Sequence, residues 1–327
     1  MNSSYRVLGL GIGVSVLLAA CIAWLRPFGM TIEFLPDTGA SWYYWQLPES
    51  NRWAQLTAWL GYLGHQVFMW GVIAYGQSQR LKPQAGLHRL NLIALGGNLL
   101  FIVLHWAQTH WYYDALAQDV SVFSSQGSVI LLLVMVLVME APRRGLLAGQ
   151  KIAWMAQCRD LLKRYHGYLF CWATIYTFWY HPMESTPGHL VGFFYTFLLL
   201  LQGSLIFTRA HSNRYWTALL ESFVLIHGSL VAWVNGGQMW PMFLFGFAGM
   251  FVITTMHGLG WRPWLRWSVL AAYLGGMALV YSERGWSQLH EVLRIPLILY
   301  LLAFLLAGLI WLGLYARRRW VGTPAQR

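Results

Sequence analysis

Charged residues are scarce in this chain. Only 10% of its 327 residues are Asp, Glu, Lys or Arg, and 57% are hydrophobic. An ordinary soluble domain carries about 25% charged residues. The composition therefore excludes a soluble globular protein and predicts an all-α, multi-pass integral membrane protein.

Cysteine is also scarce, and the three residues Cys21, Cys158 and Cys171 form neither a CxxC nor a CxxCH motif. A thiol redox pair and a covalently attached c-type haem are therefore not indicated. Lysine is absent from the long apolar runs. A retinal Schiff base would need a lysine there, so rhodopsin-like photochemistry is excluded as well.

Long apolar runs and aromatic residues are abundant instead. The chain holds 20 Trp, 17 Tyr and 17 Phe, residues that collect at membrane interfaces. Runs of about 20 apolar residues mark membrane-spanning helices, and ten are expected within one domain, 1–327. Their approximate limits are 7–25, 53–76, 91–111, 126–140, 165–180, 189–208, 216–234, 239–257, 268–282 and 295–315.

The distribution of positive charge predicts an orientation for these spans. Of the 22 Lys and Arg residues, all fall on one side of the predicted topology except Arg26, Arg52, Arg284 and Arg294. The positive-inside rule then places both termini in the cytoplasm, for a protein of the inner membrane. The same rule explains the net charge of +11 without nucleic acid as a partner.

The first span needs a choice between two interpretations. Its sequence LAAC, ending at Cys21, resembles a lipoprotein cleavage site, but the apolar run continues through Trp24. We therefore expect an uncleaved helix.

Histidine is the most informative residue type, because the chain has as many His as acidic residues, 11 of each. Ionisable groups inside a membrane are rare and mark functional sites by default. Six histidines are candidate metal ligands, and all of them except His110 are predicted to converge from different helices on a metal or haem in the outer half of the bundle. The six are His65, His105, His110, His181, His189 and His227. Structural hydrogen bonds to the backbone are the alternative role for each of them.

The pair His105 and His110 cannot aim at one ion from a straight helix, because five residues rotate the side chain by about 140°. His110 and Asp114 are four residues apart and share a face if the helix continues for another turn. A carboxylate often orients a ligating imidazole. Asp114 is therefore a candidate catalytic residue beside His110.

Two other acids are candidate catalytic residues. Glu184 lies in the short loop HPMESTPGH, residues 181–189, which brings two imidazoles and a carboxyl together between adjacent helices. This loop is either a lid over a site or only a tight connection. Glu221 lies within an apolar run, where it serves proton transfer, substrate contact or a plain interhelical hydrogen bond.

Haem b is a possible cofactor, with His166 and His211 as candidate ligands. His166 and His181 are separated by about 22 Å along a helix, and His211 and His227 by about 24 Å. These separations suit two haems at different depths. The second pair points in opposite directions, however, unless His211 precedes the helix start.

Three functions remain open. The first is a haem- or metal-dependent oxidoreductase, using Fe, Cu or Zn, that acts on a hydrophobic substrate such as a lipid or quinone. The second is a proton-coupled transporter, and the third is a lipid-modifying transferase that needs no metal. Membrane lipids are the expected partners in each case.

Overall fold

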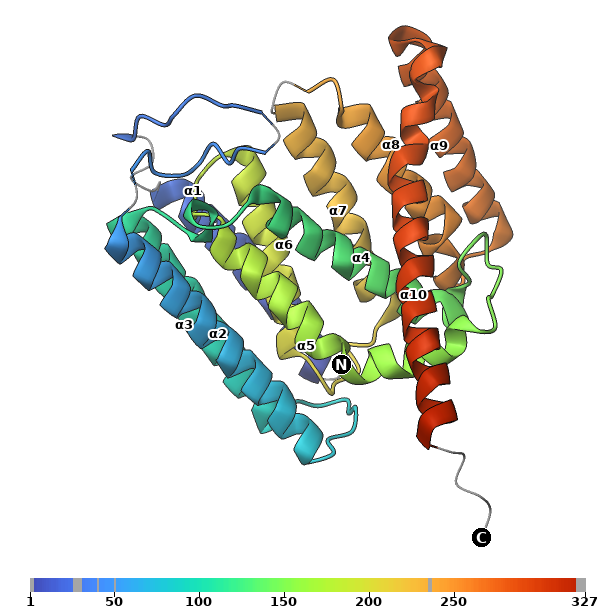
Figure 1. The fold of residues 1–327 in the computed structure, drawn as a ribbon, viewed down its shortest axis with the longest axis horizontal. Coiled ribbons are helices and arrows are strands. Elements are labelled where there is room, and N and C mark those ends of the chain that lie inside the picture. The colour runs from blue at the N-terminus through green and yellow to red at the C-terminus, as the bar shows by residue number, and fades with distance from the viewer. Residues whose placement is uncertain (1–2, 26–30, 40, 50, 235–236, 322–327) are drawn as a thin grey trace. The chain divides into compact units, whose positions relative to one another are not determined.

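The computed structural model is described here for all residues except 1–2, 26–30, 40, 50, 235–236 and 322–327. Across these described residues the chain is helical and forms no β-strand of its own (Figure 1). The α-helices are α1 (Ser3–Leu25), α2 (Arg52–Ser78), α3 (Arg89–Tyr112), α4 (Val122–Arg144), α5 (Met155–Tyr180), α6 (Pro187–Ser204), α7 (Arg214–Val234), α8 (Trp240–Ile253), α9 (Pro263–Arg284) and α10 (Arg294–Val321). Short 3-10 helices are η2 (Leu116–Gln118), η3 (Thr255–Gly258) and η4 (Trp286–Leu293).

The ten predicted spans correspond to these ten α-helices, with differences at the ends. The fifth helix begins at Met155, ten residues before the predicted limit, because its charged first turns lie outside the apolar run that marks the span. The sixth ends at Ser204 rather than at residue 208, and Phe207 beyond it has a positive φ of 59° that a helix cannot contain.

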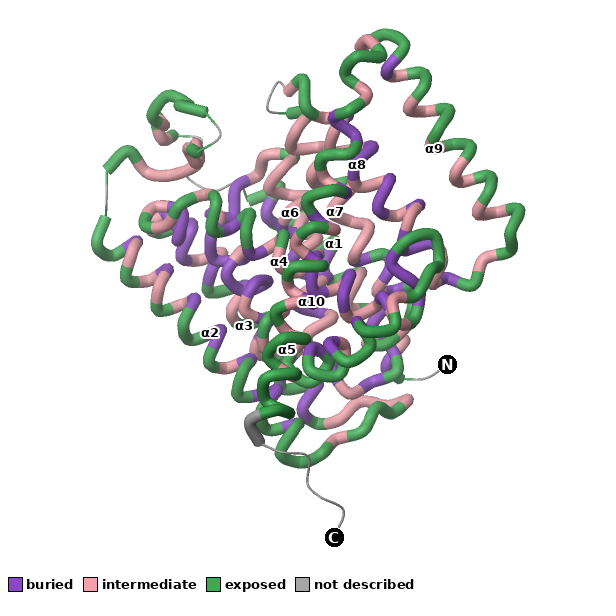
Figure 2. The backbone as a smooth tube through the Cα atoms, turned by 45° about the vertical axis from the view of Figure 1, so that its right-hand side comes forward, coloured by how far each residue is buried: buried purple, intermediate pink, exposed green. Residues whose placement is uncertain are grey.

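Six stretches of the described chain are long and apolar enough to cross a membrane. They are α1, α3, α4, α7, Trp240–Gly258 and Trp286–Arg319. Large apolar side chains such as Leu60, Leu100 and Leu301 are exposed, and exposed positions run along α2, α9 and α10 (Figure 2). Such surfaces suit contact with lipid tails. These helices indicate a membrane protein.

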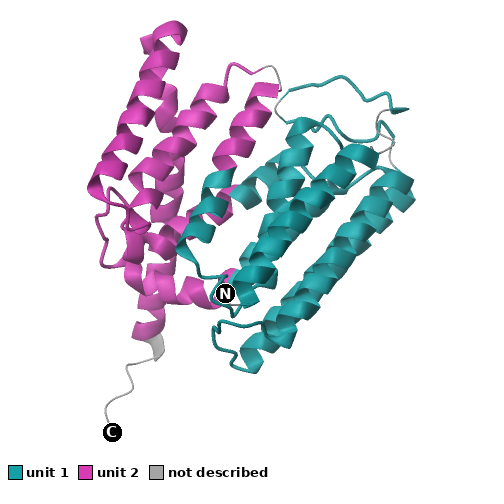
Figure 3. Cartoon of the chain, turned by 180° about the vertical axis from the view of Figure 1, so that it is seen from behind, with its two compact units in different colours: residues 1–129, 167–223 teal, residues 130–166, 224–327 magenta. Residues whose placement is uncertain are grey.

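The chain forms two compact units (Figure 3). Unit 1 comprises residues 1–129 and 167–223, and unit 2 comprises residues 130–166 and 224–327. The single domain expected from the sequence stays a prediction. In unit 1, α2 packs along α3 and α1 packs along α6. The first contact is close because a Cβ on Gly97 of α3 would lie 2.1 Å from the Phe68 ring of α2.

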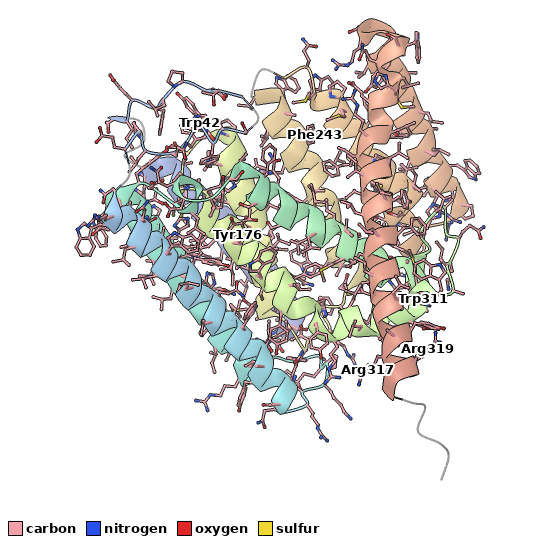
Figure 4. All side chains as sticks on the ribbon, in the orientation of Figure 1. Trp42, Tyr176, Phe243, Trp311, Arg317 and Arg319 are labelled. Atoms are coloured by element: carbon pink, nitrogen blue, oxygen red, sulfur yellow. The ribbon has the colours of Figure 1, made fainter. Side chains whose placement is uncertain are left out.

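Unit 2 contains α8, α9 and α10 around a smaller core that includes Phe245 and Tyr281. Near the C-terminal end of α10, the rings of Trp311 and Tyr315 stack with centroids 5.6 Å apart. Arg317 and Arg319 follow at the same end of the helix (Figure 4). Aromatic rings followed by cations are typical of a helix leaving a membrane.

Candidate functional site

The loop between α5 and α6 is the centre of the candidate site. Thr186 caps α6, and its hydroxyl accepts a hydrogen bond from the His189 backbone N–H at 3.3 Å. Pro187 follows at the first helical position, where a missing N–H costs nothing. The cap places the side chain of His189 beside that of His181, with ring centroids 5.8 Å apart. Two of the six predicted metal-binding histidines are thus brought together.

Tyr43 joins these two imidazoles. Its hydroxyl oxygen lies 2.8 Å from His181 Nδ1 and 2.9 Å from His189 Nε2. The other nitrogen of His189, Nδ1, lies 2.7 Å from the Thr186 hydroxyl. All four side chains are at least partly buried. Together they form a continuous hydrogen-bonded chain, His181–Tyr43–His189–Thr186, which we call the relay.

The relay has two proton arrangements. The single O–H of Tyr43 donates a hydrogen bond to one imidazole, so the Tyr43 oxygen accepts a hydrogen bond from the N–H of the other. In one arrangement Thr186 donates to His189, His189 to Tyr43, and Tyr43 to His181. In the other, every hydrogen bond is reversed, so that His181 donates to Tyr43, Tyr43 to His189, and His189 to Thr186. Passing between them moves one proton along the relay, and burial raises the pKa of Tyr43 well above its usual range, which keeps the phenol protonated.

A buried carboxyl lies in the same loop. Glu184 is 2% exposed, and its Oε2 accepts a hydrogen bond from the Tyr113 hydroxyl at 3.2 Å. Its Oε1 accepts from the Ser185 backbone N–H at 2.7 Å. Tyr113 has φ 64° and ψ −46°, a costly backbone conformation for a bulky residue. This strained position aims the Tyr113 hydroxyl at Glu184.

Asp114 does not pair with His110 as predicted. Helix α3 ends at Tyr112, so the extra turn that would place both residues on one face is missing. Asp114 is fully buried, its Oδ1 accepts from the Ala115 N–H at 2.9 Å, and its Oδ2 has no hydrogen-bond partner. Burial raises the pKa of Asp114 to about 7. His110 instead donates from Nδ1 to the Trp106 carbonyl, 2.9 Å away.

His65 lies in a separate, closed network. Its Nδ1 accepts from the indole N–H of Trp179 at 3.3 Å, so Nε2 carries the proton and donates to Asn98 Oδ1 at 2.7 Å. Asn98 in turn donates to Ser204 Oγ at 2.8 Å. Both ring nitrogens of His65 therefore have partners in the protein. This geometry fits the structural alternative and not the predicted metal role.

His105 connects this network to the relay without joining it. Its ring packs against Trp179, with centroids 4.4 Å apart, and its Nε2 donates to the backbone carbonyl of His181 at 2.9 Å. The bond fixes the end of α5 and not the His181 imidazole. His105 is completely buried. Its hydrogen bond ties α3 to the start of the loop.

The remaining predicted residues lie apart from the relay or in the other unit. Glu221 is half-buried in α7 within unit 1 and acts electrostatically on Tyr195. His211 precedes α7, as the haem hypothesis required, and its Nδ1 donates to the Gln202 carbonyl at 2.9 Å. His166 and His227 belong to unit 2. His166 donates from Nδ1 to the Lys163 carbonyl at 2.7 Å.

The predicted metal site is not assembled from the side chains that were named. Among the described residues, no group of three or more His, Cys, Asp or Glu side chains has an arrangement able to hold a metal ion. The structure keeps His181 and His189 together and gives them Tyr43 as a third neighbour.

Several residues of the site were not identified from sequence. Tyr43 lies in the segment TGASWYYWQLPES, between the first two predicted spans, where no motif marks it as a site residue. It is 138 residues from His181, and no local pattern reports so distant a contact. Tyr113 and Thr186 were missed too. The Ser/Thr-x-x cap pattern before an apolar run was the available signal for Thr186.

Comparisons with protein-family models, with curated proteins and with solved structures find no match to this chain.

Proposed function

We propose that this chain is a multi-pass inner-membrane enzyme with both termini in the cytoplasm, and that the relay catalyses metal-independent group transfer on a membrane lipid. The orientation follows from the one-sided Lys and Arg residues. It puts the loop 181–189 and Tyr43 at the outer surface. There they meet lipid headgroups while remaining partly shielded from water.

The observation that carries this proposal is the Tyr43 hydroxyl held between two imidazoles at 2.8 and 2.9 Å. Imidazole is the commonest general acid and base near neutral pH. A relay that delivers a proton to one end while removing it from the other suits a transfer reaction. His181, the histidine at the end of the relay, removes the proton of an acceptor hydroxyl while the oxygen of that hydroxyl forms the new ester bond.

The rest of the reaction balances through the same relay. The old ester bond breaks, and its oxygen receives the hydroxyl proton of Thr186 at the opposite end of the relay, while His189 passes its own proton to the Thr186 oxygen. No electron is transferred, and no further reactant is required. Glu184 and Tyr113 hold the loop rigid, and Asp114 supplies a second carboxyl that titrates near neutral pH.

The structure favours this function over proton-coupled transport through the His65 network. A path from the relay toward the other end of unit 1 would run through His105, Trp179, His65 and Asn98. Indole has a donor but no acceptor, and an amide holds its protons, so neither side chain passes a proton on. Proton transfer out of the relay along this path is therefore not expected.

The oxidoreductase remains a separate prediction, with haem or a metal as cofactor and a lipid or quinone as substrate. His181 and His189 are two members of the predicted set whose rings lie close together, with centroids 5.8 Å apart. Elemental analysis and a visible spectrum of the purified protein separate the two functions. One equivalent of Fe, Cu or Zn, or a Soret band, would overturn the metal-independent mechanism.

The direct test compares lipids by mass spectrometry after incubation of membranes with wild-type protein, Tyr43→Phe or Tyr44→Phe. Tyr43→Phe keeps the ring and removes the hydroxyl that joins the histidines, so the lipid change made by the wild type should fall at least 100-fold, the lower range for acid–base catalysis. Tyr44→Phe preserves the ring packing on Phe34 and Trp45 and should keep the activity. Equal activity of Tyr43→Phe and the wild type would refute the relay mechanism.

A further inference from the structure

Three segments of unit 1 that are distant in sequence meet at the end of the unit opposite Arg52. The Ser4 N–H, in the first turn of α1, donates to the Ala85 carbonyl at 3.2 Å. The backbone N–H of Gln84 donates to the Phe207 carbonyl at 3.2 Å. The backbone N–H of Arg209 donates to the Gln84 carbonyl at 2.9 Å. The start of α1, the α2–α3 loop and the α6–α7 loop therefore form one surface, which we call the basic face.

The basic face is held rigidly by buried polar contacts. Asn91 donates from its side-chain amide to the carbonyls of Ser204 and Ile206, both at 2.8 Å. His211 donates to the Gln202 carbonyl, and the Gln202 amide donates to the His211 carbonyl at 3.0 Å. Loops fixed in this way lose little conformational freedom when a ligand binds.

Six exposed cationic side chains lie on the segments of this face: Arg6, Arg80, Lys82, Arg89, Arg209 and Arg214. The segments 1–10, 77–91 and 205–217 contain no Asp or Glu. No carboxylate within these segments therefore neutralises the positive charge of the six cations. A cluster of four to eight cations next to membrane helices is the chemical signature of a site for anionic lipid.

Exposed aromatic and apolar side chains place these cations at the level of lipid phosphates. Tyr75 near the end of α2 is 58% exposed, and Tyr215 at the start of α7 is 52% exposed. The Arg214 guanidinium lies 4.9 Å from the centre of the Tyr215 ring. Within about one turn, Leu92 and Leu219 are exposed too. A surface for nucleic acid has no need of this adjoining apolar belt.

We propose that the basic face binds the headgroups of anionic phospholipids in the cytoplasmic leaflet. Phosphate oxygens accept hydrogen bonds from guanidinium and ammonium groups, and acyl chains lie against the exposed apolar residues beside them. This surface is separate from the relay, and its lipid is a bound partner and not the substrate.

The test is native mass spectrometry of the full-length protein in detergent, titrated with phosphatidylglycerol or phosphatidylcholine. The wild type should bind phosphatidylglycerol more tightly. The double variant Arg80→Gln, Lys82→Gln should bind it about 25-fold more weakly, because each cation contributes about fivefold. Arg209→Gln should weaken binding about fivefold.

Arg52→Gln is the matched control, because Arg52 is an exposed cation at the opposite end of α2 from Arg80. It should leave phosphatidylglycerol binding unchanged. Thermal unfolding of each variant checks that the fold is intact. The proposal is overturned if both lipids bind equally, if Arg52→Gln weakens binding as much as Arg209→Gln, or if a single-stranded RNA binds the protein more tightly than phosphatidylglycerol.

Discussion

Replacement of Asn98 by Leu should destabilise unit 1, because Asn98 is the polar link between three elements. Its Oδ1 accepts from His65 on α2, and its amide donates to the Ser204 hydroxyl and the Leu200 carbonyl on α6 at 2.8 and 3.3 Å. His65 is completely buried. Its second nitrogen is already engaged by Trp179.

The expected loss can be estimated from these contacts. Leu has a similar volume, so the main effect is the unsatisfied N–H of His65, which costs about 1–3 kcal/mol when buried. Hydrogen bonds between helices in membranes measure about 0.6 kcal/mol on average and reach about 1.7 kcal/mol. Together these values predict that the free energy of unfolding falls by about 2 kcal/mol.

Equilibrium unfolding in mixed micelles with increasing dodecyl sulfate measures this difference. Gln77→Leu is the control, because the Gln77 side chain accepts from the Tyr168 hydroxyl at an exposed position, where loss of a bond costs little. A loss for Asn98→Leu no larger than that for Gln77→Leu would show that His65 is not held by this network, and the assignment of a closed network would be wrong.

Three further variants probe the site and the packing around it. Asp114 ionises near pH 7 when folded and near pH 4 when unfolded, so the unfolded chain releases its proton first and stability falls by up to about 4 kcal/mol as the pH rises from about 4 to 7. Asp114→Asn should remove this slope in unfolding experiments across that range, and an unchanged slope would contradict the raised pKa. A Cβ on Gly61 would lie 2.1 Å from the Trp179 ring, so Gly61→Ala should cost about 1–3 kcal/mol, whereas Gly71→Ala meets nothing within 4 Å and should be neutral or stabilising. Equal unfolding free energies for the two glycine variants would show that Trp179 can move aside.

The helices could be predicted from sequence because each depends on a local property. A run of about 20 apolar residues is sufficient to mark a helix in a membrane protein, and all ten runs are helical. The errors are at helix ends, because charged turns and single backbone angles determine the residue at which a helix begins or ends. Met155 begins α5 within a charged stretch, and Tyr112 ends α3 before Asp114 can join it.

The site could be predicted only in part, because partners come from distant segments. The loop from His181 to His189 is a local feature, and its crowded imidazoles and carboxyl were recognisable. Tyr43 joins it across 138 residues. Likewise, nothing near His65 indicates that Trp179, 114 residues away, occupies one of its nitrogens.

The origin of the relay in two separate segments also bears on how the protein matures. Tyr43 is synthesised before α2, whereas Thr186 and both histidines follow four helices later. A growing chain contains no complete relay until α6 has emerged and its first turn has met the segment before α2. The hydrogen bonds of the relay therefore form only after the segments on both sides of α2–α5 have been synthesised.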